Sequence, residues 1–219
     1  MIPTFNRPQI LKRTVTLLKG NLRYSGPLRI WIGCDGSDLP PETLSDIDSV
    51  SLLSPGSGSL GANLNRLHDA ARSAGIDFYF ALDDDHWLMN PLRLDEHVTR
   101  LQNDTSAGWI HLLMDAVGDE DNDGYAFSAR LDGKYWRVDY AGADQWPCSF
   151  RAHLSHRRFH DAVGAFPAGL PTGKTEWEFN QRALRMGRAG QLPAVLVPVC
   201  AYGFDYWAHV GKSWNRRGL

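Results

Sequence analysis

Residues 76–86 restrict the fold of this chain more than any other stretch. Residues 76–82 have the apolar and aromatic content of a buried β-strand, and the run ends in three consecutive aspartates, Asp83, Asp84 and Asp85. Carboxylates this close repel one another, so their ionised form calls for a nearby cation. Hard divalent metal ions bind such oxygen ligands, often together with the phosphates of a substrate. The alternative is a polar turn that faces water.

The first half of the chain alternates between predicted strands and predicted helices. Strands are expected at residues 2–4, 28–33, 76–82 and 109–114, and helices at about 8–19, 60–74 and 91–101. This alternation predicts an α/β fold with a mostly parallel, Rossmann-like sheet and helices on both faces. In such a sheet the carboxyl ends of the strands meet at one edge, where ligands usually bind.

The second half has a different pattern. Residues 115–124 are acidic and contain glycine, which indicates a loop, and Asp132-Gly133 lies between two strand-like runs as in a β-hairpin. Residues 175–186 predict a helix and residues 194–199 a late strand. We therefore expect an added hairpin or mixed part behind the parallel sheet, within a single domain that spans residues 1–219.

Composition excludes several classes of protein. The net charge of −2 gives no overall basic field for nucleic acid or anionic membranes. The three cysteines are far apart in the sequence and odd in number, so a reducing compartment is the simpler assumption. No run approaches the roughly 20 apolar residues of a membrane span, and the N-terminus lacks the pattern of a signal peptide. We expect a cytoplasmic protein without a membrane span.

Polar motifs follow three of the predicted strands. Residues 4–7 (Thr-Phe-Asn-Arg), residues 35–37 (Asp-Gly-Ser) and residues 83–85 (Asp-Asp-Asp) come directly after them. The motifs should converge on one crevice at the edge of a parallel sheet. The chain has neither a Gly-x-Gly-x-x-Gly after the first strand nor a Walker-type Gly-Lys-Ser/Thr, which disfavours dinucleotide and P-loop sites.

These segments resemble a known family when order and spacing are taken together. Residues 2–8 (Ile-Pro-Thr-Phe-Asn-Arg-Pro), 34–38 (Cys-Asp-Gly-Ser-Asp), 61–66 (Gly-Ala-Asn-Leu-Asn-Arg) and 82–85 (Leu-Asp-Asp-Asp) are similar to successive motifs of family 2 glycosyltransferases with a GT-A fold. The resemblance implies a metal-dependent, inverting transfer of a sugar from a UDP- or GDP-type nucleotide sugar to an acceptor hydroxyl. Residues 1–114 would hold the donor and the metal. Residues 115–219 would hold the acceptor and end in a lid segment.

The resemblance also implies roles for individual residues in the donor half. Asp35 would accept a hydrogen bond from an N–H of the base ring, and Arg66 would reach a phosphate unless it is an ordinary surface arginine. The residues implied to contact the nucleotide sugar are Pro3, Thr4, Asn6, Arg7, Asp35, Arg66, Asp83 and Asp84.

The 82–85 segment resembles the DxD motif that holds Mn²⁺ or Mg²⁺ in this family. Asp85 is the leading metal ligand, Asp83 meets the ribose or the metal, and Asp84 turns into the edge of the core or shares the cation. Many GT-A enzymes complete this site with a C-terminal histidine, and residues 208–213 (Ala-His-Val-Gly-Lys-Ser) are similar to that segment. His209 is therefore a further candidate ligand, unless it is structural, and Lys212 and Arg216 are candidate cations for the diphosphate.

A second matching segment aligns on Arg182 and Gly187. Thr175 and Glu176 then fall on the family's Glu-Asp pair, although the residue types differ from the pattern. The resemblance nominates Glu176, the second member of the pair, as catalytic base, with Glu178 as the alternative. We expect Thr175 to cap a helix that begins at Glu176, with Glu178 reaching back to the cap. Both glutamates could instead be solvated helix carboxylates.

Two other functions remain open from the sequence, a nucleotidyltransferase and a non-catalytic sugar- or nucleotide-binding protein. The acceptor is also open. Aromatic residues within 115–165 suit a sugar face or a stacked base, and arginines follow at 151, 157 and 158. We favour a glycan or a small molecule, with a modified DNA base as a further acceptor class, because the chain has no dedicated nucleic-acid motif.

Overall fold

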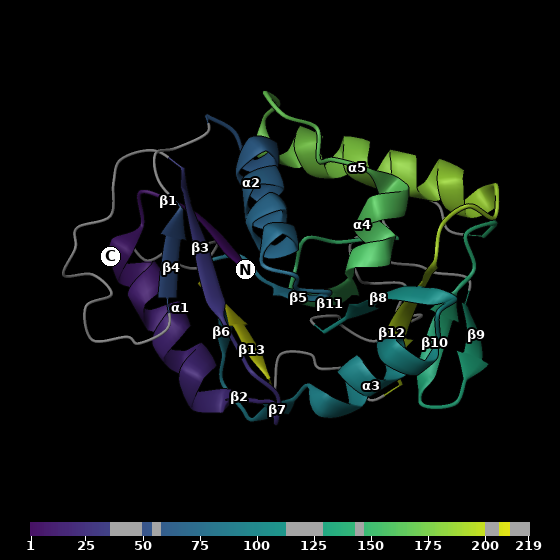
Figure 1. Ribbon diagram of the computed structural model, residues 1–219, viewed down its shortest axis with the longest axis horizontal. Helices are drawn as coiled ribbons and strands as arrows, with labels where there is room; N and C mark the ends of the chain where they lie inside the picture. Colours follow the sequence, from purple (N-terminus) through teal and green to yellow (C-terminus); the bar gives the residue numbers. More distant parts are fainter. Residues whose placement is uncertain (36–49, 54–57, 113–128, 143–146, 200–205, 211–219) are drawn as a thin grey trace.

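Three parallel strands form the N-terminal sheet of the computed structural model, which describes residues 1–35, 50–53, 58–112, 129–142, 147–199 and 206–210 (Figure 1). The order is β1 (Ile2–Phe5), β3 (Ile30–Asp35), β4 (Val50–Leu53). The side chains of Ile2 and Ile32 are fully buried and lie opposite each other in the ladder. This sheet therefore brings the ends of β1 and β3 to one edge.

A mixed sheet of six strands lies beside it. Its order is β5 (Phe78–Ala81), β11 (His153–His156), β8 (Ala107–His111), β12 (Ala194–Pro198), β10 (Tyr135–Val138), β9 (Ala129–Asp132). Only β8 and β12 are parallel neighbours in it. Two shorter ladders pair β6 (His86–Leu88) with β13 (Trp207–His209) and β2 (Leu22–Arg23) with β7 (Leu92–Arg93).

Met1 joins the two sheets. Its carbonyl accepts the N–H of Leu82 at 3.2 Å, and its amine donates to the carbonyl of Phe80 at 2.6 Å. Met1 thus bonds to the residues just before and just after Ala81, which is the hydrogen-bond pattern of parallel strands. Strands β1 and β5 therefore run in the same direction, and the three polar motifs that follow β1, β3 and β5 begin at one edge of the combined sheet.

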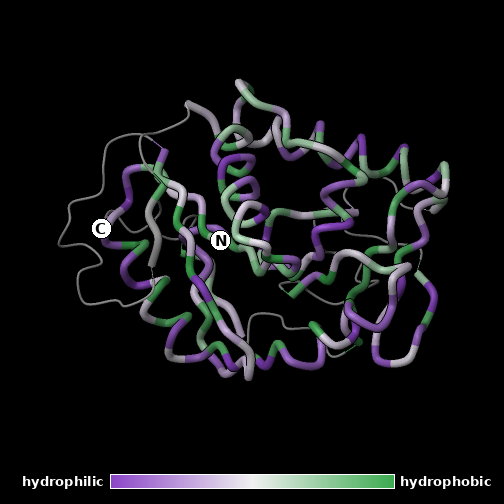
Figure 2. Tube along the Cα trace, in the orientation of Figure 1, coloured by the Kyte–Doolittle hydropathy of each residue, from purple (hydrophilic) through white to green (hydrophobic). Residues whose placement is uncertain are grey.

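Helices cover both faces of the sheet, as the sequence predicts (Figure 1). The two faces bury separate groups of side chains, and successive strand residues alternate between them: Leu196 packs in one core, Val195 and Val197 in the other. The first core contains residues of α1 (Pro8–Asn21) and α3 (Asp95–Asn103), and the second contains residues of α2 (Leu60–Ser73), α4 (Arg157–Val163) and α5 (Thr172–Arg188). Polar and apolar stretches alternate along these helices (Figure 2), the pattern of helices with one buried face.

The structure corrects the sequence prediction in several places, and it also contains short strands that were not predicted, among them β4 and β6. Strand β11 and helix α4, at residues 153–163, were not predicted, and the mixed part is therefore larger than a hairpin. Helix α3 begins at Asp95 rather than residue 91, because the preceding residues pair in β7. The hairpin turn consists of Gly133 and Lys134, one residue later than expected. Helix α5 begins at Thr172, earlier than expected. The acidic loop expected at 115–124 lies outside the described residues.

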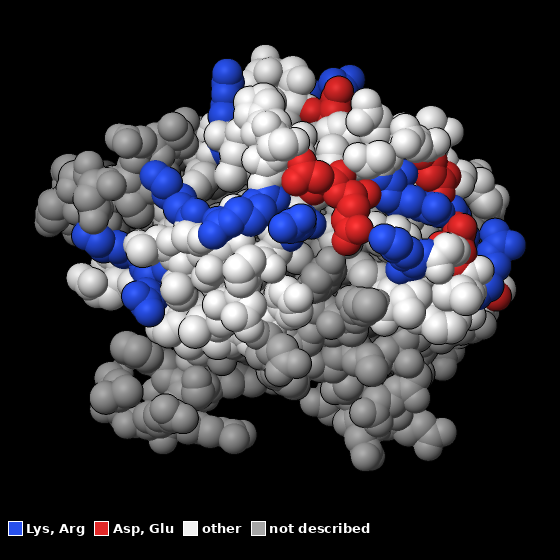
Figure 3. Space-filling model, turned by 90° about the horizontal axis from the view of Figure 1, so that it is seen from below, with Lys and Arg blue, Asp and Glu red and all other residues white. Residues whose placement is uncertain are grey.

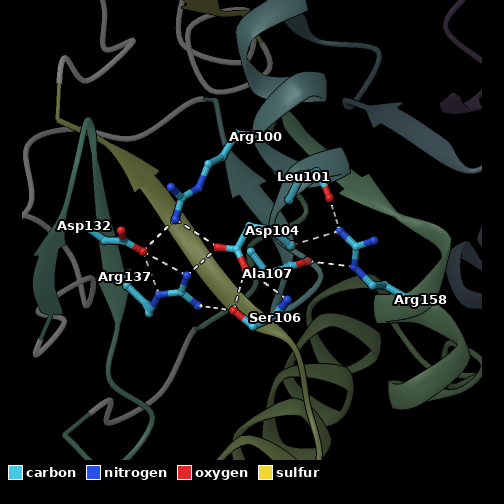
Figure 4. Close-up of polar contacts among 8 residues, drawn as sticks. All are labelled: Arg100, Leu101, Asp104, Ser106, Ala107, Asp132, Arg137 and Arg158. Atoms are coloured by element: carbon cyan, nitrogen blue, oxygen red, sulfur yellow. Dashed lines mark hydrogen bonds and ion pairs between the residues drawn. The ribbon is translucent and has the colours of Figure 1, made fainter.

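A charged network ties this mixed part together (Figure 4). Arg137 of β10 contacts Asp104, which follows α3, at 2.5 Å and Asp132 of β9 at 2.9 Å. Arg100 of α3 contacts the same two carboxylates at 2.9 and 2.6 Å. The network thus links α3 to the hairpin. Arg158 of α4 is bound close by, because it donates to the carbonyl of Ala107, the first residue of β8, at 2.8 Å.

Candidate active site

A cleft of about 500 Å³ opens where β1, β3 and β5 end. Residues from all three strand ends line it, together with residues of the α2 and α5 regions and one residue near the start of β11. The lining consists of Pro3, Thr4, Phe5, Arg7, Asp35, Gly58, Ser59, Leu60, Asn63, Asp83, Asp84, Asp85, Phe150, Leu170, Pro171, Thr172 and Glu176. The predicted convergence of three strand-end motifs on one crevice is therefore present in the structure.

Asp84 faces into the protein at the floor of this cleft. Its side chain is fully buried and accepts a hydrogen bond from Thr4 Oγ1 at 2.5 Å, and it also pairs with Arg7. The hydroxyl of Thr14 in α1 donates to the Asp84 carbonyl. Burial raises the pKa of Asp84 to about 6, although Thr4 and Arg7 oppose this shift. Asp84 thus connects β1, α1 and the acidic segment, which matches its expected turn into the core edge.

Asp83, Asp85 and His86 form the group best suited to hold a metal ion among the described residues. One ligand atom from each lies within 4.8 Å of the others. His86 Nδ1 is 3.7 Å from Asp83 Oδ2 and 3.8 Å from Asp85 Oδ1, too far for hydrogen bonds. Neighbouring ligands of one ion lie roughly 3–3.6 Å apart when the bonds are about 2.1 Å. The two separations from His86 are therefore a few tenths of an ångström longer than those between ligands of one ion, and all three groups lie close enough to converge on a divalent cation.

Arg7 fixes the orientation of Asp85. Its Nη1 donates to Asp85 Oδ2 at 2.9 Å, while the other oxygen, Oδ1, is the one near His86. The side chain of Asp83 keeps 37% of its surface exposed in the cleft. Even so, the enclosing protein and the negative charges of Asp85 and Glu176 raise its pKa well above its usual range. A bound cation would relieve this repulsion.

No motif in the sequence nominates His86, although it directly follows the three aspartates. The backbone of the C-terminal segment lies beside this group. His209 is opposite His86 in the β6–β13 ladder, and the N–H of Val210 donates to the Asp85 carbonyl at 3.0 Å. Lys212 and Arg216 lie outside the described residues.

The remaining predicted donor residues divide into two groups. Asp35 is buried, lines the cleft, and accepts the N–H of Gly58 at 2.7 Å. Arg66 does not line the cleft. It donates to the Cys34 carbonyl at 2.9 Å and thereby holds α2 against the end of β3. Asn6 is also not among the lining residues. It is exposed and adopts a left-handed conformation with φ of 50° between β1 and α1.

Glu176 lies on the wall of the cleft that α5 supplies. Its Oε1 accepts the N–H of Phe150 at 2.9 Å and the hydroxyl of Ser149 at 3.4 Å. Burial raises the pKa of Glu176 above its ordinary value, which makes the carboxylate a better proton acceptor. Glu178 is not among the residues that line the cleft.

The prediction that Thr175 is the N-cap of the helix that carries Glu176 is wrong. Helix α5 begins at Thr172, directly after Pro171, so Thr175 and Glu178 are inside the helix. The hydroxyl of Thr175 instead donates to the carbonyl of Leu170 at 3.3 Å. Pro171 is the N-cap residue, and its carbonyl accepts the N–H groups of Lys174 and Thr175 at 2.9 Å.

A model of the glycosyl transferase family 2 matches residues 1–153 of this sequence. The chain belongs to glycosyl transferase family 2. The family 2 match includes the β1 motif, the three aspartates and His86, and it ends before Glu176. A search of curated proteins gave no significant match.

Comparison with solved structures agrees with the family 2 assignment. The S. aureus protein TarS (residues 1–349) superposes with a TM-score of 0.60 at 15% identity, over 98% of this chain and 61% of that one. The mannosyltransferase PcManGT from Pyrobaculum calidifontis, solved with GDP-Man and Mn²⁺, gives 0.59 at 15% identity, over 92% and 54%. This family 2 chain thus spans about three fifths or less of each neighbour's length. Both neighbours have the GT-A fold, so that prediction is confirmed.

Proposed function

We propose that this chain is a metal-dependent, inverting glycosyltransferase in which Glu176 is the catalytic base. The observation that carries the proposal is one cleft that combines an Asp83–Asp85–His86 group able to hold a metal ion with a carboxylate of raised pKa, Glu176, on its α5 wall. The first feature suits the leaving diphosphate and the second suits an acceptor hydroxyl. Membership of family 2 supports the reaction class.

The metal would be held by Asp83, Asp85 and His86, with His209 as a further candidate because its backbone lies opposite His86. Two carboxylate oxygens and one imidazole nitrogen favour Mn²⁺ over Mg²⁺, since Mg²⁺ prefers an all-oxygen set. The bound ion would supply positive charge to the diphosphate as it leaves. The Mn²⁺ in the complex of the P. calidifontis neighbour supports this choice.

The donor would lie across the ends of β1 and β3. Asp35 lines the cleft and would accept an N–H of the base, while Thr4 and Arg7 act mainly by holding Asp84 and Asp85 in place. Pro3 and Phe5 contribute apolar surface to the same wall. A UDP- or GDP-type nucleotide sugar suits this arrangement, and the GDP-Man of the P. calidifontis neighbour supports the class.

The transfer step follows from the position of Glu176. With Oε1 held by two donors, Oε2 is left to take the proton of the acceptor hydroxyl. The acceptor oxygen forms a bond to the anomeric carbon as the bond from that carbon to the diphosphate oxygen breaks. The nucleoside diphosphate leaves with the electron pair. Attack on the face of the sugar away from the leaving diphosphate inverts the anomeric configuration.

We propose a glycan or a small molecule as acceptor. Two of the three arginines that the sequence offered as a nucleic-acid contact are paired within the protein: Arg158 donates to the carbonyl of Ala107 at 2.8 Å, and Arg157 forms a surface ion pair with Asp161 at 3.3 Å. One face of the molecule carries a row of lysines and arginines beside a group of acidic side chains (Figure 3). Mixed charge of this kind gives that face no uniform attraction for DNA.

A donor panel tests the proposed function. The protein is incubated with UDP- and GDP-sugars and Mn²⁺, and release of nucleoside diphosphate is measured with water as the acceptor. We expect release with a subset of donors, loss of it in excess EDTA or in Asp85→Asn, and a drop of roughly 100-fold or more in Glu176→Gln, the usual contribution of a general base. Glutamine keeps an oxygen for Phe150 and Ser149, so the fold is preserved.

Other results would indicate the competing functions. Pyrophosphate release from nucleoside triphosphates would indicate a nucleotidyltransferase, and saturable donor binding without any release would indicate a binding protein. Full activity in EDTA would contradict metal dependence, and an active Glu176→Gln variant would remove Glu176 as the base.

A further inference from the structure

A short loop, residues 147–151, supplies the donors that hold Glu176. The N–H of Phe150 and the hydroxyl of Ser149 both point to Oε1 of the carboxylate. The Ser149 oxygen also accepts the N–H of Arg151 at 3.2 Å, so this hydroxyl links the backbone of the loop to Glu176. The loop therefore fixes the orientation of the Glu176 carboxylate at the cleft.

Asn180 connects this loop to the helix that carries Glu176. Its Oδ1 accepts the N–H of Cys148 at 2.8 Å, and its Nδ2 donates to the backbone carbonyl of Glu176 at 3.0 Å. Asn180 lies one helical turn after Glu176, and its side chain is fully buried. One amide thus fixes the loop and the backbone of Glu176 relative to each other.

The burial of this amide is informative. A buried polar side chain is unfavourable unless its hydrogen bonds are made, and leucine of similar size would fill the same space without that requirement. Both hydrogen bonds of Asn180 lead to Glu176, one directly and one through the Cys148–Phe150 backbone. They connect no other element described in the structure.

We propose that Asn180 is a positioning residue for the base: it holds the 147–151 loop so that Phe150 and Ser149 fix Oε1 and turn Oε2 toward the acceptor. The inference rests on the proposed function, since Glu176 is a base only there. It adds a residue that the family 2 match does not reach, because that match ends at residue 153.

The test compares Asn180→Leu with Asn65→Leu. Asn65 is a matched control because its side chain also makes two backbone hydrogen bonds, to the N–H and the carbonyl of Phe166 at 2.8 and 2.9 Å, without contacting Glu176 or its loop. We expect Asn180→Leu to lower kcat for donor hydrolysis about tenfold or more, the effect of a displaced catalytic group, with the donor KM unchanged. Asn65→Leu should lose stability but keep kcat.

Two gentler variants guard against misfolding. Asn180→Gln keeps an amide with both an acceptor for Cys148 and a donor for the Glu176 carbonyl, and it should retain more kcat than Asn180→Leu. Ser149→Ala removes one donor and should lower kcat by several-fold at unchanged affinity for nucleoside diphosphate with Mn²⁺, measured by calorimetry. Equal kcat in Asn180→Leu and Asn65→Leu would overturn the proposal.

Amide hydrogen exchange separates this inference from the proposed function. The amides of Cys148 and Phe150 should exchange faster in Asn180→Leu and remain protected in Asn65→Leu, whether or not a donor is turned over. A protein that releases no nucleoside diphosphate would refute the function, and with it the role of Asn180 toward a base. Unchanged exchange at Phe150 would refute the positioning contact by itself.

Discussion

At the scale of single residues, the acidic segment assigns a different position to each of three neighbouring carboxylates. Asp84 is buried against Thr4, Asp85 is held by Arg7, and Asp83 remains in the cleft. His86 completes the group on the next strand, with only 4% of its side chain exposed. This division lets one carboxylate support the fold while the other two face a common point.

The composition of this group predicts a metal preference. We expect His86→Ala to lower Mn²⁺ affinity at least about tenfold, comparable to losses from disturbed metal shells, and to reduce the preference for Mn²⁺ over Mg²⁺. Isothermal titration with each metal in the presence of a nucleoside diphosphate measures both effects. His156→Ala, a histidine at the start of α4, is the control and should bind both metals as wild type does. Unaltered Mn²⁺ binding in His86→Ala would exclude His86 as a ligand.

At the scale of elements, the network around Asp104 holds the hairpin to α3 (Figure 4). The side chain of Arg137 is only 13% exposed and contacts two carboxylates. We expect Arg137→Ala to lower the free energy of unfolding by about 2–3 kcal/mol, because charged hydrogen bonds in a largely desolvated site are lost. Urea denaturation of Arg130→Ala provides the control: this exposed arginine lies directly opposite in the β9–β10 ladder, and its loss should change stability by less than about 0.5 kcal/mol. Equal effects of the two substitutions would show that the network contributes little.

At the scale of the whole molecule, buried histidines predict acid sensitivity. Burial lowers the pKa of His68 to about 3 and those of His97 and His111 to about 4, and it holds the pKa of His153 and His160 well below the usual range. The unfolded chain takes up these protons below a pH of about 6.5, so the folded state is favoured above that pH and loses stability as the pH falls. Each histidine accounts for about 2 kcal/mol between pH 7 and pH 5.

Carboxylates with raised pKa act in the opposite direction. Asp83, Asp84 and Glu176 bind protons more readily in the folded protein and offset part of the loss. Because the histidines are more numerous, we expect the free energy of unfolding to fall by a few kcal/mol from pH 7 to pH 5. Urea titrations at several pH values measure this slope, and constant or rising stability toward pH 5 would contradict the prediction.

The sequence predicted those features that depend on local pattern. Apolar periodicity located β3, α2 and β5, and the short motifs after the strands located the cleft. It failed where burial depends on distant partners. The His-Leu-Ser-His stretch of β11 appears polar in sequence, yet His153 stacks on Trp109 at 3.7 Å between ring centroids. The loop contacts of Glu176 join positions 26 and 27 residues apart, which no local pattern encodes.

The attachment of Glu176 to residues 149 and 150 also has a consequence for the design of chimeric enzymes. A natural junction for exchanging acceptor specificity would be the end of the family match, at residue 153. Such a junction would separate the carboxylate from the loop that orients it. Residues 147–188 should therefore be transplanted as one block, because the loop, α4 and the whole of α5 then arrive with their mutual hydrogen bonds intact.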